Sequence, residues 1–508
     1  MFDPQVNRKI PILMGTQHPD NAGKPFWGDD AFIHSKQEAE EIYHCFKDIG
    51  CDEYMWDWEG KFADEAMIEK LLSQYFEYFK EQQIGRDKFI TLRIPNIWEE
   101  KTFKLARAYM SVLSAAEFSK SLGLYTPSVF ELILPMTKSA DQLGHIQETF
   151  RKTAKLHESI FDEEKFGEGY IHIIPLFESV SDLAGCASVL RSFLEGHRER
   201  FGFLPPYLRA FIARSDPALN AGFVPAVLAT HMALREFYRI GDEFGIPVYP
   251  IIGTGSLPFR GGINPENIEN SLKQYAGTKT VTIQSAFRYD YPLDQVRSAF
   301  EYIKAECSDA KKVTFGDEEF AELIKVNEMF SNLYSKTIEN FAPLINEMAG
   351  FVPNRRERVQ HVGLFGYSRG TGEVRLPRAI KFTAACYSLG VPPEFIGTGR
   401  GLKKAKDMGW GELIDKHFFT LVWELTHAGK FLNMENLERL AGDGLGWACD
   451  VLEDVRLCGE ILGIEFGPKK DHHFLHRNVT SNILLKRGLG EDFSGDILEA
   501  AVLRKSLG

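Results

Sequence analysis

Two carboxylates, Glu178 and Asp216, directly follow apolar runs, in the segments PLFESVSDL and FIARSDPALN. No histidine or cysteine flanks either of them. Paired hard oxygen ligands suit Mg²⁺ or Mn²⁺, which keep several of their waters in proteins. The alternative is that each segment only begins a helix, because Ser and Asp are good N-cap residues. The repeated placement after an apolar run favours the metal site.

Arginines suited to binding an anion lie in glycine-rich segments. GTGSLPFRGG, residues 253–262, combines four glycines with Arg260, so backbone amides and a guanidinium can approach one anion. No GK[ST] follows, so it is not a Walker A motif, and a flexible connection is the alternative. GLFGYSRG places Arg369 among small and aromatic residues, near three further arginines that a solvated basic face would also explain. With His18 in TQHPDN, these groups indicate a small, multiply anionic, phosphorylated substrate.

Eight short apolar runs precede the polar groups, and each is followed by a helix-period segment or a long loop. They are KIPILMG, DEYMW, KFITLRIP, VFELILPM, YIHIIPLFE, LRAFIARSD, PVYPIIG and TVTIQ. Alternating strands and helices predict a parallel sheet, and eight units in about 300 residues predict a closed (β/α)8 barrel of TIM type. An open doubly wound sheet is the alternative, but no Gly-rich phosphate turn follows the first strand.

The polar groups lie where the predicted strands end. Loops at the carboxyl ends of barrel strands form one face, which is where functional side chains gather. Strong polar groups follow seven of the eight strands, and the fourth ends at Met136 and Thr137. In chain order they are Thr16, Gln17 and His18; Asp57 and Glu59; Arg93; Glu178; Arg214 and Asp216; Arg260; and Gln284 with Arg288. Together they predict one lined pocket.

The pattern changes after about residue 309, where the segments become helical in period. Examples are residues 318–350, 376–390 and 410–429. We therefore expect a barrel over residues 1–308 that carries the catalytic face, and a mainly helical region over residues 309–508 that packs on the barrel and completes the site.

Composition limits the class of partner and the compartment. The net charge of -12 argues against nucleic acid as a partner. The seven cysteines are scattered without a CxxC pair, so no disulfide framework or zinc site is indicated. There is no charged leader before an apolar run and no apolar stretch of about 18 residues, so no membrane association is expected. These features predict a cytoplasmic protein.

Five segments resemble blocks of one family, phosphoenolpyruvate carboxylase, in its short, archaeal-type branch. They are MGTQHPDN, ARSDPALNAG, GTGSLPFRGG, TIQSAFRYD and HVGLFGYSR, and the resemblance spans nearly the whole chain. It implies a carboxy-lyase with a (β/α)8 barrel and added helices, Mg²⁺ (or Mn²⁺) as cofactor, and a homotetramer.

The larger bacterial and plant form of the family is similar more loosely, through boxes that match GTQHPD, PLFESVSDL and RSDPALNAG. This similarity implies catalytic roles for His18, Arg260 and Arg93, substrate binding by Arg288, Gln284 and Arg369, and metal binding by Glu178 and Asp216. There are two departures. No histidine lies between Pro250 and Gly262, and Leu219 stands in place of a lysine, so the group that guides CO₂ is not identified.

The reaction that the resemblance implies is carboxylation of phosphoenolpyruvate by bicarbonate, giving oxaloacetate and phosphate through carboxyphosphate and a metal-stabilised enolate. This is anaplerotic carbon fixation. Two alternatives remain. One is another Mg²⁺-dependent barrel lyase or aldolase that forms an enolate from a 2-oxo acid. The other is a catalytically inactive, anion-sensing subunit, which would be expected to lack the metal pair or His18.

Overall fold

The barrel strands are short, apolar and buried. The computed structural model describes residues 8–60, 63–99, 103–161, 169–307, 311–357 and 374–508. Eight parallel strands close in chain order, with β8 pairing back to β1. They are β1 (Leu13–Thr16), β2 (Glu53–Asp57), β3 (Phe89–Arg93), β4 (Glu131–Leu134), β5 (His172–Phe177), β6 (Phe211–Ala213), β7 (Ile251–Gly253) and β8 (Thr280–Ile283). Each overlaps one of the eight predicted runs, so the (β/α)8 barrel is confirmed.

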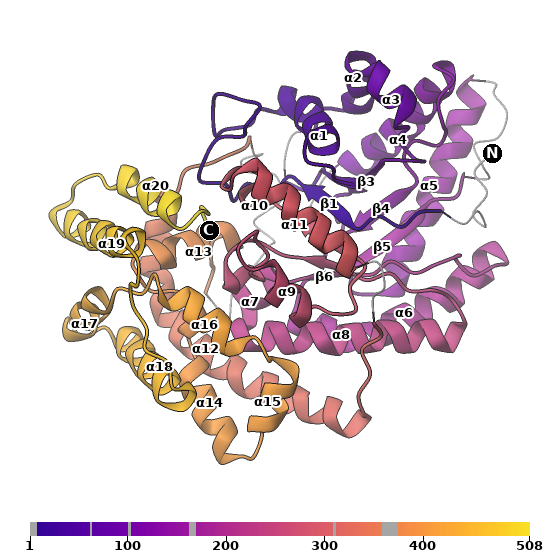
Figure 1. Cartoon of the computed structure of the whole chain (residues 1–508). Coiled ribbons are helices and arrows are strands. Elements are labelled where there is room, and N and C mark those ends of the chain that lie inside the picture. Colours follow the sequence, from indigo (N-terminus) through magenta and orange to yellow (C-terminus); the bar gives the residue numbers. More distant parts are fainter. Residues whose placement is uncertain (1–7, 61–62, 100–102, 162–168, 308–310, 358–373) are drawn as a thin grey trace.

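Helices connect the strands and cover the outside of the barrel (Figure 1). They are α1 (Glu38–Lys47), α2 (Met67–Gln74), α3 (Phe76–Glu81), α4 (Lys104–Ser121), α5 (Ala140–Phe161), α6 (Val180–Phe201), α7 (Ser215–Ala221), α8 (Phe223–Phe244), α9 (Ile268–Gln274), α10 (Ser285–Tyr289) and α11 (Leu293–Glu306). Because the strands are covered by helices outside and by side chains inside, they are apolar along most of their length rather than alternating.

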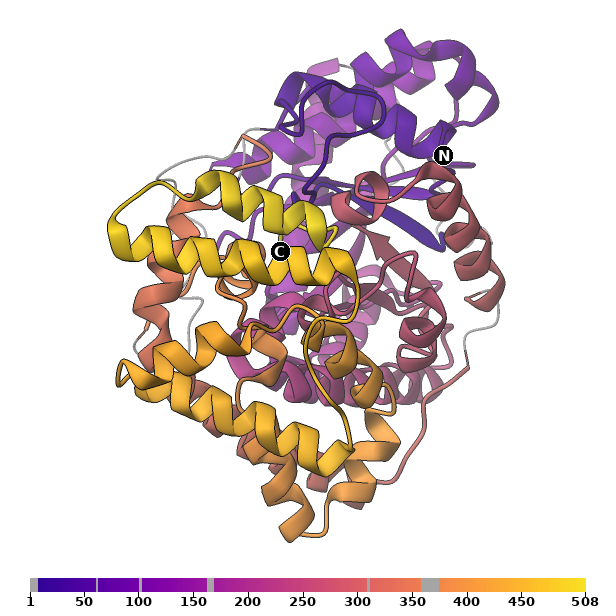
Figure 2. The same ribbon diagram turned by 60° about the vertical axis from the view of Figure 1, so that its left-hand side comes forward.

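The described chain after α11 is helical, as predicted. It forms α12 (Asp317–Phe351), α13 (Ala379–Ser388), α14 (Thr398–Asp407), α15 (Gly411–His417), α16 (Leu421–Gly429), α17 (Met434–Gly442), α18 (Gly446–Leu462), α19 (Asp471–Leu489) and α20 (Ser494–Leu503). Residues 410–429 form two helices, and Gln274 donates to the His417 carbonyl at 2.9 Å where the chain turns between them. In Figure 2 the α19–α20 hairpin crosses the front of the molecule. None of the helices described is both long and apolar enough to span a bilayer.

Three apolar clusters hold the layers together. A small one fills the inside of the barrel, with Met14, Ile174 and Phe211 among its members. A large one lies between the strands and their outer helices. The third joins the helical region to α7 and α8, where Leu219 packs beside Tyr334. The helical region is therefore packed against the barrel at the helices that follow β6.

A buried ion cluster closes the amino-terminal end of the barrel. Arg209 donates to Glu53 at 2.7 Å and to Glu131 at 2.6 Å, and all three side chains are at most 2% exposed. Arg209 also bonds Thr280 at 3.2 Å. Removing one partner of such a cluster leaves a buried charge uncompensated, which is strongly destabilising. This end is structural, and the opposite end of the strands carries the cavity described next.

Candidate active site

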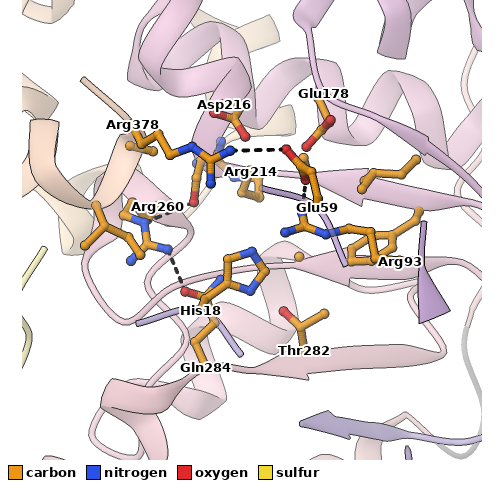
Figure 3. A pocket seen from close by; sticks show the side chains of 17 residues that line it. His18, Glu59, Arg93, Glu178, Arg214, Asp216, Arg260, Thr282, Gln284 and Arg378 are labelled. Atoms are coloured by element: carbon orange, nitrogen blue, oxygen red, sulfur yellow. Dashed lines mark hydrogen bonds and ion pairs between the residues drawn. The ribbon is translucent and has the colours of Figure 1, made fainter. Parts of the chain in front are cut away.

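A cavity of about 80 Å³ lies at the carboxyl ends of the strands (Figure 3). Residues at or just after every strand except β4 line it, together with Arg378, Ala379 and Ile380 from the start of α13. Its polar lining consists of His18, Glu59, Arg93, Glu178, Arg214, Ser215, Asp216, Arg260, Thr282, Gln284 and Arg378. The predicted lined pocket is therefore present, and its size favours a small substrate.

His18 enters the cavity from the loop after β1. Its Nδ1 lies 2.9 Å from the Thr16 hydroxyl, which fixes the plane of the ring. The neighbouring Gln17 accepts the backbone N–H of Asp57 at 2.9 Å and ties this loop to the end of β2. The bonds hold His18 in a defined orientation, as a group that transfers protons needs.

Arg93 is held at the end of β3 by two carboxylates from the end of β2. Its Nε and Nη2 donate to Asp57 at 3.0 and 2.7 Å, and its Nη1 lies 3.2 Å from Glu59. Burial alone would lower the pKa of Arg93, but Asp57 and Glu59 outweigh it and hold the pKa well above its usual value. Arg93 is thus a permanently charged, rigidly placed cation.

Glu178 and Asp216 line the cavity from neighbouring strands, β5 and β6. Glu178 accepts the backbone N–H of Met136 at 2.9 Å, and Met136 has a φ of 48°, in the sparsely populated left-handed region. Ser179, not Glu178, caps α6 by accepting from the N–H of Asp182 at 3.0 Å. Asp216 lies inside the first turn of α7, where no side-chain cap is formed. The helix-cap alternative therefore does not account for either carboxylate.

The carboxylate pair fits a hard divalent cation. Both side chains offer oxygen ligands, and no group of three or more His, Cys, Asp or Glu side chains in the described ranges is arranged around a metal position. A two-carboxylate set leaves room for waters or substrate oxygens, which Mg²⁺ usually retains. These residues would hold the cation if one binds.

The guanidinium of Arg260 makes hydrogen bonds to residues from distant parts of the chain. Its Nη1 donates to Asp20 at 3.0 Å and to the Gly508 carbonyl at 2.5 Å, its Nη2 to Gln284 at 2.5 Å, and its Nε to Ser215 at 3.1 Å. Burial lowers the pKa of Arg260, while Asp20 opposes that shift. The guanidinium is thus fixed by residues from the first turn of α7, the end of β8, the loop after β1 and the segment after α20.

Asp20 makes contacts with several separate segments in this arrangement. The residue is fully buried, and its second carboxylate oxygen accepts the N–H of Ala286 at 2.7 Å. Its backbone carbonyl accepts the N–H of Leu507 at 2.7 Å. Asp20 therefore connects the β1 loop to α10, to Arg260 and to residues 506–508. It does not cap α1, which begins at Glu38.

Gly508→Ala should lower turnover about 100-fold, because a small displacement of a positioned catalytic group has an effect of that size. A Cβ at this position would lie 2.0 Å from the Ile380 carbonyl and 2.7 Å from the Ala384 amide, so the backbone must leave Arg260. Initial rates measure the effect. Gly488→Ala is the matched control, since its Cβ would meet no atom within 4 Å. Equal rates for the two variants would contradict a role for residue 508.

Arg288, a predicted substrate-binding residue, is not among the described residues that line the cavity. It donates to the Thr16 carbonyl at 2.7 Å and pairs with Glu41 at 3.0 Å. Burial would raise the pKa of Glu41, but Arg356 and Arg288 outweigh it and lower the pKa to about 2. Arg369 lies outside the described residues. Substrate binding by both stays a prediction.

The structure brings six predicted residues to one cavity: His18, Arg93, Glu178, Asp216, Arg260 and Gln284. Their roles stay predictions. The sequence analysis assigned no role to Glu59 or Arg214. Their position at predicted strand ends was the feature that could have identified them as site residues. Arg378 was missed altogether. Its Nη2 lies 3.4 Å from Glu59, which is 319 residues away along the chain. No local sequence pattern predicts a contact over that separation.

Comparisons with known proteins agree in one family. The family model described as phosphoenolpyruvate carboxylase matches residues 10–508. A phosphoenolpyruvate carboxylase of Leuconostoc mesenteroides is 39% identical over 506 residues, covering 99% of this chain and all of the relative. One from Oenococcus oeni is 39% identical over 486 residues, covering 94% of this chain and 95% of the relative. One from Metallosphaera sedula is 36% identical over 520 residues, covering 99% of this chain and all of the relative.

Proposed function

The chain belongs to the phosphoenolpyruvate carboxylase family, and from this premise we propose that it converts phosphoenolpyruvate and bicarbonate to oxaloacetate and phosphate. The observation that carries the proposal is the convergence of His18, the Glu178–Asp216 pair and four arginines on one cavity. A phosphorylated, carboxylated substrate needs cationic groups, and a small site limits access of water.

We propose a two-stage reaction. A bicarbonate oxygen attacks the phosphorus atom, the bond from phosphorus to the enol oxygen breaks, and carboxyphosphate and the pyruvate enolate result. Carboxyphosphate then releases CO₂ and phosphate, and the enolate carbon attacks CO₂ to form oxaloacetate. His18 takes the proton that bicarbonate loses. Proton transfer by a positioned histidine is a common catalytic device.

The arginines stabilise charge during the transfer. Arg93 and Arg260 are fixed before substrate binds, Arg93 by Asp57 and Glu59 and Arg260 by Asp20 and Gln284. Cations that are already positioned cost little reorganisation when charge moves onto the bridging oxygen. Held by Glu178 and Asp216, Mg²⁺ (or Mn²⁺) would offset negative charge on the enolate oxygen.

The barrel-lyase alternative requires the same carboxylate pair but fewer arginines. The inactive-subunit alternative is disfavoured because His18, Glu178 and Asp216 are all present and all line the cavity.

By resemblance to the family we also propose a homotetramer in the cytoplasm. Sedimentation at several concentrations tests the tetramer.

Bicarbonate dependence tests the proposed reaction. Phosphate release from phosphoenolpyruvate should require added bicarbonate and Mg²⁺ and should equal the oxaloacetate trapped by a coupled malate dehydrogenase. Phosphate release without bicarbonate, or product other than oxaloacetate, would indicate the other barrel lyases. The control is the same enzyme in degassed, bicarbonate-free buffer.

A further inference from the structure

Arg214 differs from the other arginines at the cavity in how its guanidinium is hydrogen-bonded. The residue is fully buried and lines the cavity. Its Nε donates to the Tyr275 hydroxyl at 3.0 Å, whereas Nη1 and Nη2 have no hydrogen-bond partner among the described residues. By contrast, Arg93 pairs with Asp57, Arg260 with Asp20, and Arg378 with Glu59.

One neighbouring carboxyl, that of Glu424, does not supply a counter-charge to this guanidinium. Glu424 is close enough for the charge of Arg214 to act on it, but burial outweighs that influence and raises the pKa of Glu424 to about 8. Its carboxyl is therefore mainly protonated at neutral pH. Buried hydrogen-bond donors without acceptors are costly, and such groups in native proteins need an explanation. A bound oxyanion would supply the missing acceptors.

Tyr275 fixes which edge of the guanidinium is available. Its hydroxyl accepts from Arg214 Nε and donates to the Gly261 carbonyl at 3.1 Å, in the loop that carries Arg260. The edge formed by Nη1 and Nη2 is left for a ligand. Both nitrogens are covered in this conformation, so binding requires a neighbouring side chain to move.

We propose that Arg214 binds the phosphoryl group of the substrate through Nη1 and Nη2, beside Glu178 and Asp216. The inference rests on the proposed function for the identity of the substrate. The phosphoryl group is favoured over bicarbonate and over the substrate carboxylate. All three can accept from both donors of an arginine fork, but the phosphoryl group carries up to two charges near neutral pH, whereas bicarbonate and a carboxylate carry one.

Calorimetric titration of inorganic phosphate, with MgCl₂ present, tests the proposal. Arg214→Met should bind phosphate about 100-fold more weakly than the unmodified enzyme. Arg214→Lys keeps the charge but loses the fork, and roughly a tenfold loss is expected. Tyr275→Phe should lose a few-fold, since the fork remains but its orientation is relaxed. Arg191→Met is the matched control, because Arg191 pairs with Glu243 on the outer helices; its phosphate affinity should be unchanged.

Several results would overturn the proposal. One is phosphate affinity in folded Arg214→Met equal to that of the unmodified enzyme. Another is an increased KM for bicarbonate with phosphate affinity unchanged, which would assign the fork to bicarbonate. If Arg214→Met does not fold, unchanged affinity in Arg214→Lys decides against it. Phosphate binding that depends on Arg214, in an enzyme that makes no oxaloacetate, would remove the proposed function but keep the site. Normal oxaloacetate formation by Arg214→Met would remove the proposed phosphate site but keep the proposed function.

Discussion

Asp216→Asn is expected to lower the rate of oxaloacetate formation at least about 1,000-fold, equivalent to about 4 kcal/mol of transition-state stabilisation. The side chain keeps its shape but loses the charge that would hold a divalent cation beside Glu178 at the cavity. Glu178→Gln should have a similar effect, because the two carboxylates would share the ion. The coupled malate dehydrogenase assay measures turnover, and direct Mn²⁺ titration measures metal affinity.

Two comparisons separate metal binding from other losses. Asp182→Asn is the matched control, since Asp182 lies one turn from Glu178 but pairs with Lys138 at 2.5 Å; its turnover should be normal. His18→Asn should lose turnover with Mn²⁺ affinity unchanged, because His18 is proposed to move a proton. Turnover of Asp216→Asn within tenfold of the unmodified enzyme would contradict the metal site.

Asp20→Ala should reduce the free energy of unfolding by about 3 kcal/mol, and it should reduce turnover of the folded enzyme about 100-fold. The substitution leaves Arg260 buried without its carboxylate partner, and it also removes the acceptor for the Ala286 amide. Chemical denaturation measures the loss of stability, and initial rates at a temperature where the variant stays folded measure turnover. Asp20→Asn keeps an oxygen acceptor and should be intermediate in both.

Glu53→Ala is the control that distinguishes positioning from stability. Glu53 is also fully buried and is paired with an arginine, Arg209 at 2.7 Å, but at the amino-terminal end of the barrel. It should lose comparable stability while keeping the turnover of the folded enzyme. Normal turnover in folded Asp20→Ala would mean that Asp20 only stabilises the chain.

The fold and much of the site could be predicted from the sequence because they depend on local pattern. Alternating apolar runs and helix-period segments specify a parallel barrel, and a parallel barrel places all its strand ends on one face. His18, Glu178 and Asp216 each follow a strand closely, so knowledge of the strands was enough to bring them together. The resemblance to a family then assigned them roles.

Tertiary structure decided which arginines face the cavity and what holds them. Arg288 and Arg214 both follow strand ends, Arg288 in the α10 helix after β8 and Arg214 directly after β6, yet Arg288 turns to Glu41 while Arg214 lines the cavity. Arg260 is fixed by Asp20 and Gly508, which lie 240 and 248 residues away along the chain. Such pairs form only when distant segments pack together. The hydrophobic periodicity of a segment predicts which face of a helix or strand is buried. It does not predict which charged side chain of another element will pack against that face.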